Sequence, residues 1–281
     1  MLPRKLKFQP QAVDDPGDPR VADFFRLNDP GLRRAVERPD GGAGGSGGGF
    51  FVAEGALVIR QLLRSHYPVR AVLVTDQGLA ALEDDLPGMD APVYRVSQAL
   101  MTTVTGFHFH RGALASAERR PHPELATVVE RADLVLMAEG VTDNENLGAL
   151  FRNAAAFGVG GVVLDATSAA PLYRRSVRVS MGPVLRLPFP RVGDSVEAMV
   201  RLQGLGFEIL ALTPEGTADD IRTVAPRARQ VLLVGAEGPG LSDAALRAAD
   251  RRLRIAMRGD VDSLNVATAA AVALHHLARH R

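Results

Sequence analysis

Short apolar runs alternate with helical stretches through the second half of the chain, and this alternation restricts the fold more than any other feature. We predict buried strands at residues 134–138, 161–164, 184–187, 208–212, 231–234 and 253–256. We predict helices at residues 147–157, 195–203, 243–249 and 264–278. Alternating strands and helices build a mostly parallel sheet covered by helices, so we predict an α/β fold for this half.

The first half carries a shorter version of the same pattern. Residues 1–20 contain four prolines and little apolar periodicity, so we expect a loosely ordered arm. Residues 21–114 have enough strand and helix signals for a small α/β domain, in which residues 40–49 form a flexible glycine-rich loop. We place a linker at residues 115–130 and a second domain at residues 131–281.

The composition excludes several classes of site. The chain has no cysteine, which excludes disulfides, cysteine-bound zinc, iron–sulfur clusters and thiol nucleophiles. No apolar run approaches the roughly 18 residues of a membrane-spanning helix, and the first residues lack the apolar core of a secretory signal. We therefore expect a cytoplasmic protein that does not bind membranes.

The basic residues of the chain are almost all arginines, although its net charge is only +1. Lys5 and Lys7 are the only lysines, so the other 31 of the 33 basic side chains are arginines. Arginine binds phosphate in a bidentate way and stacks on bases. The base composition of a GC-rich genome explains the same bias, so the count alone assigns no partner.

The first segment that is typical of a functional site follows the predicted strand at residues 134–138. Asn146 is suited to begin a helix, and Gly158 is suited to end it. Arg152 interrupts this otherwise small or apolar helix. An arginine in such a place usually extends into water, but here it lies just beyond a strand-to-helix loop, where α/β sheets bind ligands.

The second segment is a loop with three glycines after the predicted strand at residues 231–234. Gly235, Gly238 and Gly240 let a ligand approach the backbone closely. Their spacing is Gly-x-x-Gly-x-Gly, which differs from the fingerprint of dinucleotide-binding folds. Glu237 in this loop is a solvated acid, a partner for a ribose hydroxyl or a residue that positions a base.

The third segment places Ser263 and Asn265 before a nearly apolar helix, where helix capping explains them as well as chemistry does. In order, the three segments read Asn-x-Gly-x-x-x-Arg with a later Phe-Gly, Gly-x-Glu-Gly-x-Gly, and Ser-Leu-Asn-Val. This order resembles the SpoU (TrmH-type) family of RNA ribose 2′-O-methyltransferases in the SPOUT superfamily, over about residues 130–278. Residues 21–112 are similar to the small substrate-binding domain, related to ribosomal RNA-binding proteins, that many members carry.

The resemblance implies a parallel-sheet domain whose C-terminal segment forms a trefoil knot, and a homodimer with its sites at the subunit interface. It also implies S-adenosylmethionine as the methyl donor and no metal. The residues that it places at the donor, largely through backbone groups, are Thr213, Gly235, Gly240, Ile255 and Leu264.

The resemblance further implies a set of catalytic residues. Arg152 is central, either as an unusual base or as an electrostatic clamp, and we favour the clamp because a guanidinium rarely deprotonates. A ribose hydroxyl is a poor nucleophile while it is protonated, so it must be aligned with the methyl group. The residues expected to orient Arg152 and the ribose are Asn146, Glu237, Ser263 and Asn265.

Three positions depart from the family pattern. The family often has proline at the positions of Asn144 and Ala256, and serine at the position of Ala267. All three lie beside the key residues, so they bear on the fine geometry of the site and not on the class of reaction.

Residues outside the three segments are candidates for RNA contact. Arg174, Arg175 and Arg178 share a short segment that can meet phosphates or equally form a solvated face, and Arg111 lies in the segment that carries the resemblance of the first domain. Residues 105–112 alternate like a strand and place two histidines on one face. Without a clear third ligand we expect no metal there, but a polar strand face or a turn near RNA.

We therefore favour an RNA ribose 2′-O-methyltransferase that acts on ribosomal RNA rather than tRNA. A tRNA methyltransferase and a methylase for antibiotic resistance share the same architecture. A non-catalytic RNA-binding paralogue is the second hypothesis, and the intact motif residues argue against it. A nucleotide-dependent oxidoreductase is the third, and the glycine spacing argues against it.

Overall fold

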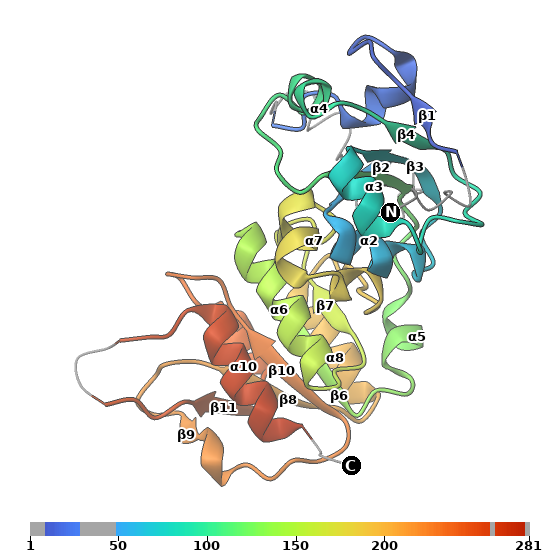
Figure 1. Ribbon diagram of the computed structural model, residues 1–281. Coiled ribbons are helices and arrows are strands. Elements are labelled where there is room, and N and C mark those ends of the chain that lie inside the picture. The colour runs from blue at the N-terminus through green and yellow to red at the C-terminus, as the bar shows by residue number, and fades with distance from the viewer. Residues whose placement is uncertain (1–8, 29–48, 259–261, 279–281) are drawn as a thin grey trace. The chain divides into compact units, whose positions relative to one another are not determined.

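A computed structural model describes residues 9–28, 49–258 and 262–278 of the chain. These residues divide into two compact units (Figure 1). Unit 1 comprises residues 9–28, 49–121 and 172–186, and unit 2 comprises residues 122–171, 187–258 and 262–278. The short segment 172–186 therefore belongs to unit 1, although residues of unit 2 flank it on both sides in the sequence.

Unit 2 is built on a six-stranded sheet in which every pair of neighbouring strands is parallel, and this confirms the predicted α/β fold. In spatial order its strands are β7 (Val162–Leu164), β6 (Leu134–Ala138), β10 (Gln230–Val234), β8 (Glu208–Leu212), β11 (Arg251–Arg254) and β9 (Asp219–Asp220). The central strands are fully buried apolar runs, as expected for a parallel sheet covered on both faces.

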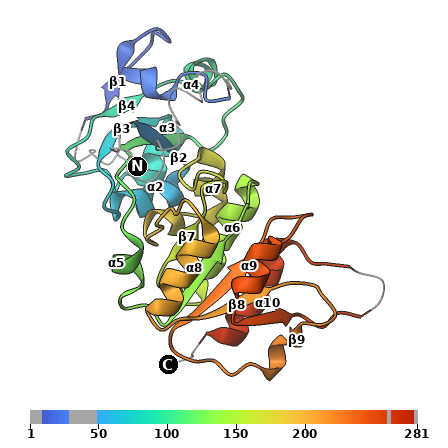
Figure 2. The same cartoon turned by 180° about the vertical axis from the view of Figure 1, so that it is seen from behind.

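Helices cover both faces of this sheet, as the two opposite views show (Figures 1 and 2). One face carries α6 (Asn144–Ala156) and α10 (Val266–Leu277). The other carries α5 (Leu125–Val129), α8 (Ser195–Gly204) and α9 (Asp243–Ala248), which pack in one core cluster with odd-numbered strand residues such as Met137 and Leu233. Because successive side chains of a strand point to opposite faces, the even-numbered residues face α6 and α10.

Unit 1 contains a five-stranded mixed sheet. In spatial order its strands are β1 (Gln11–Ala12), β4 (Val93–Arg95), β3 (Val69–Val74), β5 (Ala113–Glu118) and β2 (Phe50–Glu54). β5 runs antiparallel to both of its neighbours, and the remaining pairs are parallel. Its helical segments are η1 (Pro19–Phe24), α2 (Ala56–Leu63), α3 (Asp76–Leu82), α4 (Gln98–Thr105), α7 (Arg174–Ser180) and η2 (Pro183–Leu185).

Three segments differ from the local structure that their sequence predicts. Residues 106–112 form a loop instead of the predicted strand. Gly106 adopts the left-handed conformation that ends α4, and the loop follows it. Residues 113–118, most of which the sequence assigns to a linker, form the buried strand β5. Residues 183–185 form a 3₁₀ turn instead of part of a strand, because Pro183 follows a glycine and starts a helical turn.

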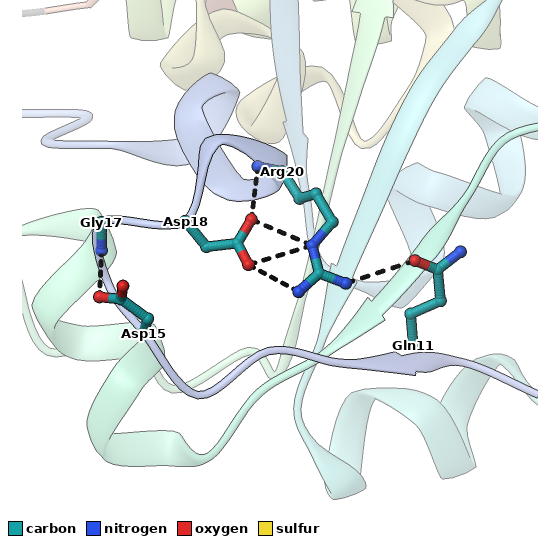
Figure 3. A network of polar contacts seen from close by, with 5 residues as sticks. All are labelled: Gln11, Asp15, Gly17, Asp18 and Arg20. Carbon is teal, nitrogen blue, oxygen red and sulfur yellow. Dashed lines mark hydrogen bonds and ion pairs between the residues drawn. The ribbon is translucent and has the colours of Figure 1, made fainter.

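The described part of the predicted N-terminal arm is folded onto unit 1. Val13 is almost fully buried in the same core cluster as Phe24. Asp18 accepts hydrogen bonds from the backbone N–H and from the guanidinium of Arg20, which also donates to Gln11 (Figure 3). These hydrogen bonds from Arg20 hold the pKa of Asp18 below its ordinary value. Residues 1–8 and most of the predicted glycine-rich loop at 40–49 lie outside the described residues.

Two kinds of feature are not found within the described ranges 9–28, 49–258 and 262–278. No helix there is long and apolar enough to cross a membrane. No group of three or more histidine, cysteine, aspartate or glutamate side chains there is arranged to hold a metal ion.

Candidate active site in unit 2

A cavity of about 440 Å³ opens where β8, β10 and β11 end and α10 begins. This is the carboxyl edge of the parallel sheet, where α/β folds bind ligands, and the volume suits a small organic molecule. The structure places at this cavity all five residues expected at a methyl donor and three of those expected in catalysis: Thr213, Gly235, Gly240, Ile255, Leu264, Glu237, Ser263 and Asn265.

The glycine loop after β10 is folded back on itself. The backbone N–H of Gly240 donates to the carbonyl oxygen of Ala236 at 3.0 Å. A Cβ atom added to Gly235 would lie 2.3 Å from the carbonyl carbon of Gly240, so no other residue fits there without moving the loop. The backbone of this tight turn forms part of the cavity wall.

Asn265, in the third sequence segment, is hydrogen-bonded to residues of the first and the second. Its side-chain oxygen caps α10 by accepting hydrogen bonds from the backbone N–H groups of Ala267 and Thr268. Its amide nitrogen donates to Asn146 Oδ1 at 2.8 Å and to Glu237 Oε1 at 2.5 Å. Because the oxygen is committed to the helix, the amide can take only one orientation, and both partners must present an acceptor to it.

The sequence predicts that Asn146 caps α6, but this prediction is wrong. Asp143 takes that role and accepts hydrogen bonds from the backbone N–H groups of Glu145 and Asn146. The side chain of Asn146 is therefore released to face Asn265. Since its oxygen accepts from Asn265, its own NH₂ group stays available as a donor to a ligand.

Arg152 lies on the same helix as Asn146, about one and a half turns further on. Its side chain is exposed, and its guanidinium has no hydrogen bond or ion pair with any other described residue. The neighbouring Asn153 donates to the carbonyl oxygen of Ala267 at 2.7 Å, which fixes α6 against the start of α10. Arg152 is thus an exposed cation with no partner in the described part of the chain, on a helix that is firmly held.

Two acidic residues that the sequence motifs do not include hold loops at this edge of the sheet. Glu139 follows β6 and accepts hydrogen bonds from the backbone N–H and the hydroxyl of Ser242, at 2.9 and 3.0 Å. Ser242 begins α9, directly after the glycine loop. The signal that marks Glu139 is an acid immediately after a buried strand, at the edge where ligands bind.

Asp165 is the second of these residues and follows β7. It accepts hydrogen bonds from Ser168, Thr167 and the backbone N–H of Gly140. Burial alone raises its pKa, but these hydrogen bonds outweigh burial and hold the pKa below its ordinary value. Asp165 therefore stays ionised and ties the loop after β6 to the loop after β7.

The four arginines proposed for RNA contact all lie in unit 1. Arg174 begins α7 and is mostly buried, because it donates to Glu54 at 2.9 Å and to Asn28 at 2.7 Å. Arg111 is half exposed and also contacts Glu54, at 3.2 Å. Arg175 is exposed, and Arg178 lies partly buried in the last turn of α7.

The sequence and the structure are both similar to methyltransferases. An uncharacterised tRNA/rRNA methyltransferase of Mycobacterium tuberculosis is 47% identical over 272 residues, which cover 96% of this chain and 92% of that protein. A 23S rRNA (guanosine-2′-O-)-methyltransferase of Xanthomonas campestris is 32% identical over 223 residues, or 76% of this chain and 89% of that protein. The crystal structure of an AdoMet-bound rRNA methyltransferase from Sinorhizobium meliloti is 25% identical, with a TM-score of 0.77 over 96% of this chain and 98% of that one.

The family model that matches this chain covers most of unit 2 together with the segment 172–186 of unit 1. The sequence model of the SpoU rRNA Methylase family matches residues 133–275, which run from the start of β6 almost to the end of α10 and include all three sequence segments. Together with the relatives that match almost the whole chain, this match shows that the chain belongs to the SpoU rRNA Methylase family of RNA methyltransferases.

Proposed function

We propose that this RNA methyltransferase methylates a ribose 2′-hydroxyl in ribosomal RNA, with S-adenosylmethionine as the donor. One observation carries the proposal. Asn146, Glu237 and Asn265, which come from three distant segments, are joined by hydrogen bonds beside the cavity, and the exposed side chain of Arg152 lies on the helix that carries Asn146. The ribose target and the ribosomal substrate are also supported by the similarity to the Xanthomonas campestris enzyme.

The residues around the cavity fit S-adenosylmethionine. Leu212, Ile255 and Met257 offer apolar surface to an adenine ring, and the glycine loop offers backbone groups at close range. Glu237 lines the cavity, where its carboxylate would attract the positive charge of this cofactor. When bound, S-adenosylmethionine supplies a methyl group on a sulfonium, an electrophile that needs no metal.

The chain itself orients the ribose and stabilises the charge that develops on it. The free NH₂ group of Asn146 donates to the ribose, and Asn265 holds both Asn146 and Glu237 in place. Arg152 stays protonated, binds an RNA phosphate and stabilises the negative charge that grows on the 2′-oxygen. The proton of the hydroxyl passes to that phosphate or to water. In this scheme Arg152 is an electrostatic clamp and not a base.

Three further features complete the proposal. Unit 1 binds the RNA substrate, the active enzyme is a homodimer, and the C-terminal part of unit 2 forms a trefoil knot. The resemblance to the SpoU family supports all three, and the choice of ribosomal RNA over tRNA rests on the presence of unit 1.

The test is transfer of labelled methyl groups from S-adenosylmethionine to unmodified ribosomal RNA and tRNA, with digestion by alkali. We expect label in ribosomal RNA, in dinucleotides that resist alkali because the 2′-oxygen is methylated. Arg152→Ala should reduce transfer at least a hundredfold and leave the affinity for S-adenosylmethionine unchanged. Arg201→Ala, which removes an exposed arginine on α8, is the matched control and should behave as the wild type.

Three outcomes would contradict the proposal. Label that alkali releases in mononucleotides would place the methyl group on a base. Label in tRNA alone would assign the other RNA substrate. A chain that binds RNA but does not bind S-adenosylmethionine would be a non-catalytic paralogue.

A further inference from the structure

Unit 1 presents an exposed cluster of rings and guanidinium groups that the site in unit 2 does not use. It consists of the turn at residues 25–28 and the loop at residues 106–112, which we call the ring cluster. We propose that the ring cluster binds an unpaired stretch of RNA, in which a base stacks on the rings of His108 and His110 while Arg26 and Arg111 hold phosphates. This inference rests on the proposed RNA substrate.

The loop of the ring cluster is firmly anchored. Phe109 is fully buried in the core of unit 1, and its carbonyl oxygen accepts a hydrogen bond from the side chain of Gln98 at 2.6 Å. The buried hydroxyl of Thr105 lies between the carbonyl oxygens of Met101 and Phe107, at 2.8 and 3.0 Å. A loop held in this way presents its remaining side chains in fixed positions, which reduces the entropy lost when a ligand binds.

The two histidines on either side of Phe109 point outward and stack on each other. The ring centroids of His108 and His110 are 4.1 Å apart, and the ring planes are inclined by 27°. Both side chains are exposed, and neither has a hydrogen bond to another described residue. A stacked pair of flat rings with an open outer face is the kind of platform on which unpaired RNA bases stack.

Arg26 brings a second ring and a second charge to the loop. Its Cα lies 3.6 Å from the position that a Cβ of Gly106 would occupy, so the turn and the loop are adjacent. Its guanidinium lies over the exposed ring of Phe25, 5.2 Å from the centroid. Arg26 also has a φ of 46°, a conformation that costs free energy in a non-glycine residue and that occurs often at functional sites.

The strained turn at Arg26 is held by α4. The backbone N–H of Arg26 donates to the carbonyl oxygen of Val104 at 2.7 Å, and that of Leu27 donates to Thr105 at 3.0 Å. These bonds also satisfy carbonyl groups near the end of α4 that the helix leaves without partners. The surrounding structure thus keeps Arg26 and Phe25 beside the loop.

The charges of the ring cluster do not cancel. The buried carboxylate of Glu54 contacts two guanidinium groups, those of Arg111 and Arg174. Arg174 is mostly buried and lies over the ring of Phe107, so it satisfies Glu54 from inside. Arg111 contacts Glu54 through Nε and is half exposed, so a phosphate can reach its side chain from solvent.

The test uses the full-length protein and a fluorescently labelled, unmodified 23S rRNA transcript. The double variant His108→Ala/His110→Ala should bind this RNA about tenfold more weakly, because a stacked base loses its platform. The double variant His108→Phe/His110→Phe restores flat rings and should bind within threefold of the wild type. His66→Ala, which removes an exposed histidine of unit 1 whose ring is tilted against that of Tyr67, is the matched control.

Two further measurements separate the ring cluster from the catalytic site. The affinity for S-adenosylmethionine and kcat at saturating RNA should match the wild type in all of these variants, while KM for RNA rises with the loss of affinity. Arg26→Ala should reduce the slope of log affinity against log salt concentration by about one, because one phosphate contact is lost.

The inference is overturned if the alanine pair binds RNA as the wild type does, or if the phenylalanine pair is as weak as the alanine pair. A loss of binding seen only with protein-containing ribosomal assembly intermediates, and not with the transcript, would assign the ring cluster to a protein partner and also overturn it. RNA binding is measured without S-adenosylmethionine. A wild type that transfers no methyl group, combined with weaker RNA binding by the alanine pair, would therefore refute the proposed catalysis alone.

Discussion

The two sheets of this chain differ in which loops meet at one edge of the sheet. In unit 2 all strands are parallel, so the segments that follow β8, β10 and β11 meet at one edge, and the cavity opens there. In unit 1, β5 is antiparallel to its neighbours, so the loop that precedes β5 meets the ends of β2 and β3. The candidate site at the cavity of unit 2 is therefore formed by segments that follow strands, whereas the loop of the ring cluster precedes one.

The two regions also differ in how their side chains are held. In unit 2 the site residues form part of the structure, since Asn265 caps a helix and the glycine loop closes on itself. In the ring cluster the histidine rings are attached to a fixed loop but are not needed to hold it. Removal of the Asn265 side chain should thus affect folding and chemistry together, whereas loss of the histidine rings should affect RNA binding alone.

The largest effect that this comparison predicts comes from Asn265. Asn265→Ala removes both the cap of α10 and the link to Glu237, so we expect methyl transfer to fall at least a hundredfold and the free energy of unfolding to fall by about 1 kcal/mol. Asn265→Ser separates the two roles, because serine caps helices equally well but is too short to donate to Glu237. It should be as stable as the wild type and inactive. An Asn265→Ser enzyme with activity within tenfold of the wild type would refute the role of the link.

Gly235 should give the next largest effect. Gly235→Ala places a methyl group 2.3 Å from the backbone of Gly240, so the loop must move, and we expect the affinity for S-adenosylmethionine to fall about tenfold to a hundredfold in calorimetric titration. Gly216→Ala is the control, since an added Cβ there meets nothing within 4 Å. Equal affinities for the two variants would show that the cofactor does not use this loop.

Asp165 should make stability depend on pH. Its pKa is lowered in the folded chain, so its contribution is present above the ordinary aspartate pKa and is lost as the pH falls through the folded value. Asp165→Asn should lower the free energy of unfolding by about 2 kcal/mol at pH 7, and this deficit should shrink as the pH falls below about 4. Urea titrations of the wild type and the variant at pH 7 and below about pH 4 measure this deficit. A deficit that grows at low pH would contradict the assignment.

The smallest effect is expected in the sheet of unit 1. The hydroxyl of Ser116 is buried in β5 without a hydrogen-bond partner among the described residues, so Ser116→Ala should raise the free energy of unfolding by about 1 kcal/mol and leave methyl transfer unchanged. Ser180→Ala is the matched control, because that hydroxyl donates to Val177 and accepts from Gly182, and its loss should destabilise. Thermal denaturation of both variants distinguishes the two cases.

The strands and helices of unit 2 follow from its sequence because its apolar runs are continuous and long. The exceptions are short elements such as α5, which lies in the predicted linker, and β9. Residues 183–185, which also differ from the prediction, belong to unit 1. In unit 1, the sequence does not predict β5. This strand is made of small residues such as Ala115 and Ala117, which carry little apolar signal although they are fully buried.

For the candidate site, the sequence likewise predicts some features and not others. Sequence motifs name Asn146, Glu237 and Asn265, but no local pattern predicts that one amide joins them, since Asn146 and Asn265 are 119 positions apart. Asn146 also looks like the helix cap, and only the structure shows that Asp143 caps α6 in its place. Hydrogen bonds between distant segments depend on the path of the whole chain, which local patterns do not contain.

The segment 172–186 has a consequence for the order in which the chain can fold during synthesis. Unit 1 needs this segment, since Arg174 in it is the mostly buried partner of the Glu54 carboxylate. Unit 1 therefore cannot be completed until about two thirds of the chain has left the ribosome, although most of its residues are made first. A nascent or truncated chain that ends at residue 121 would retain a buried acid with only its exposed arginine partner, so unit 1 cannot be isolated by a single cut.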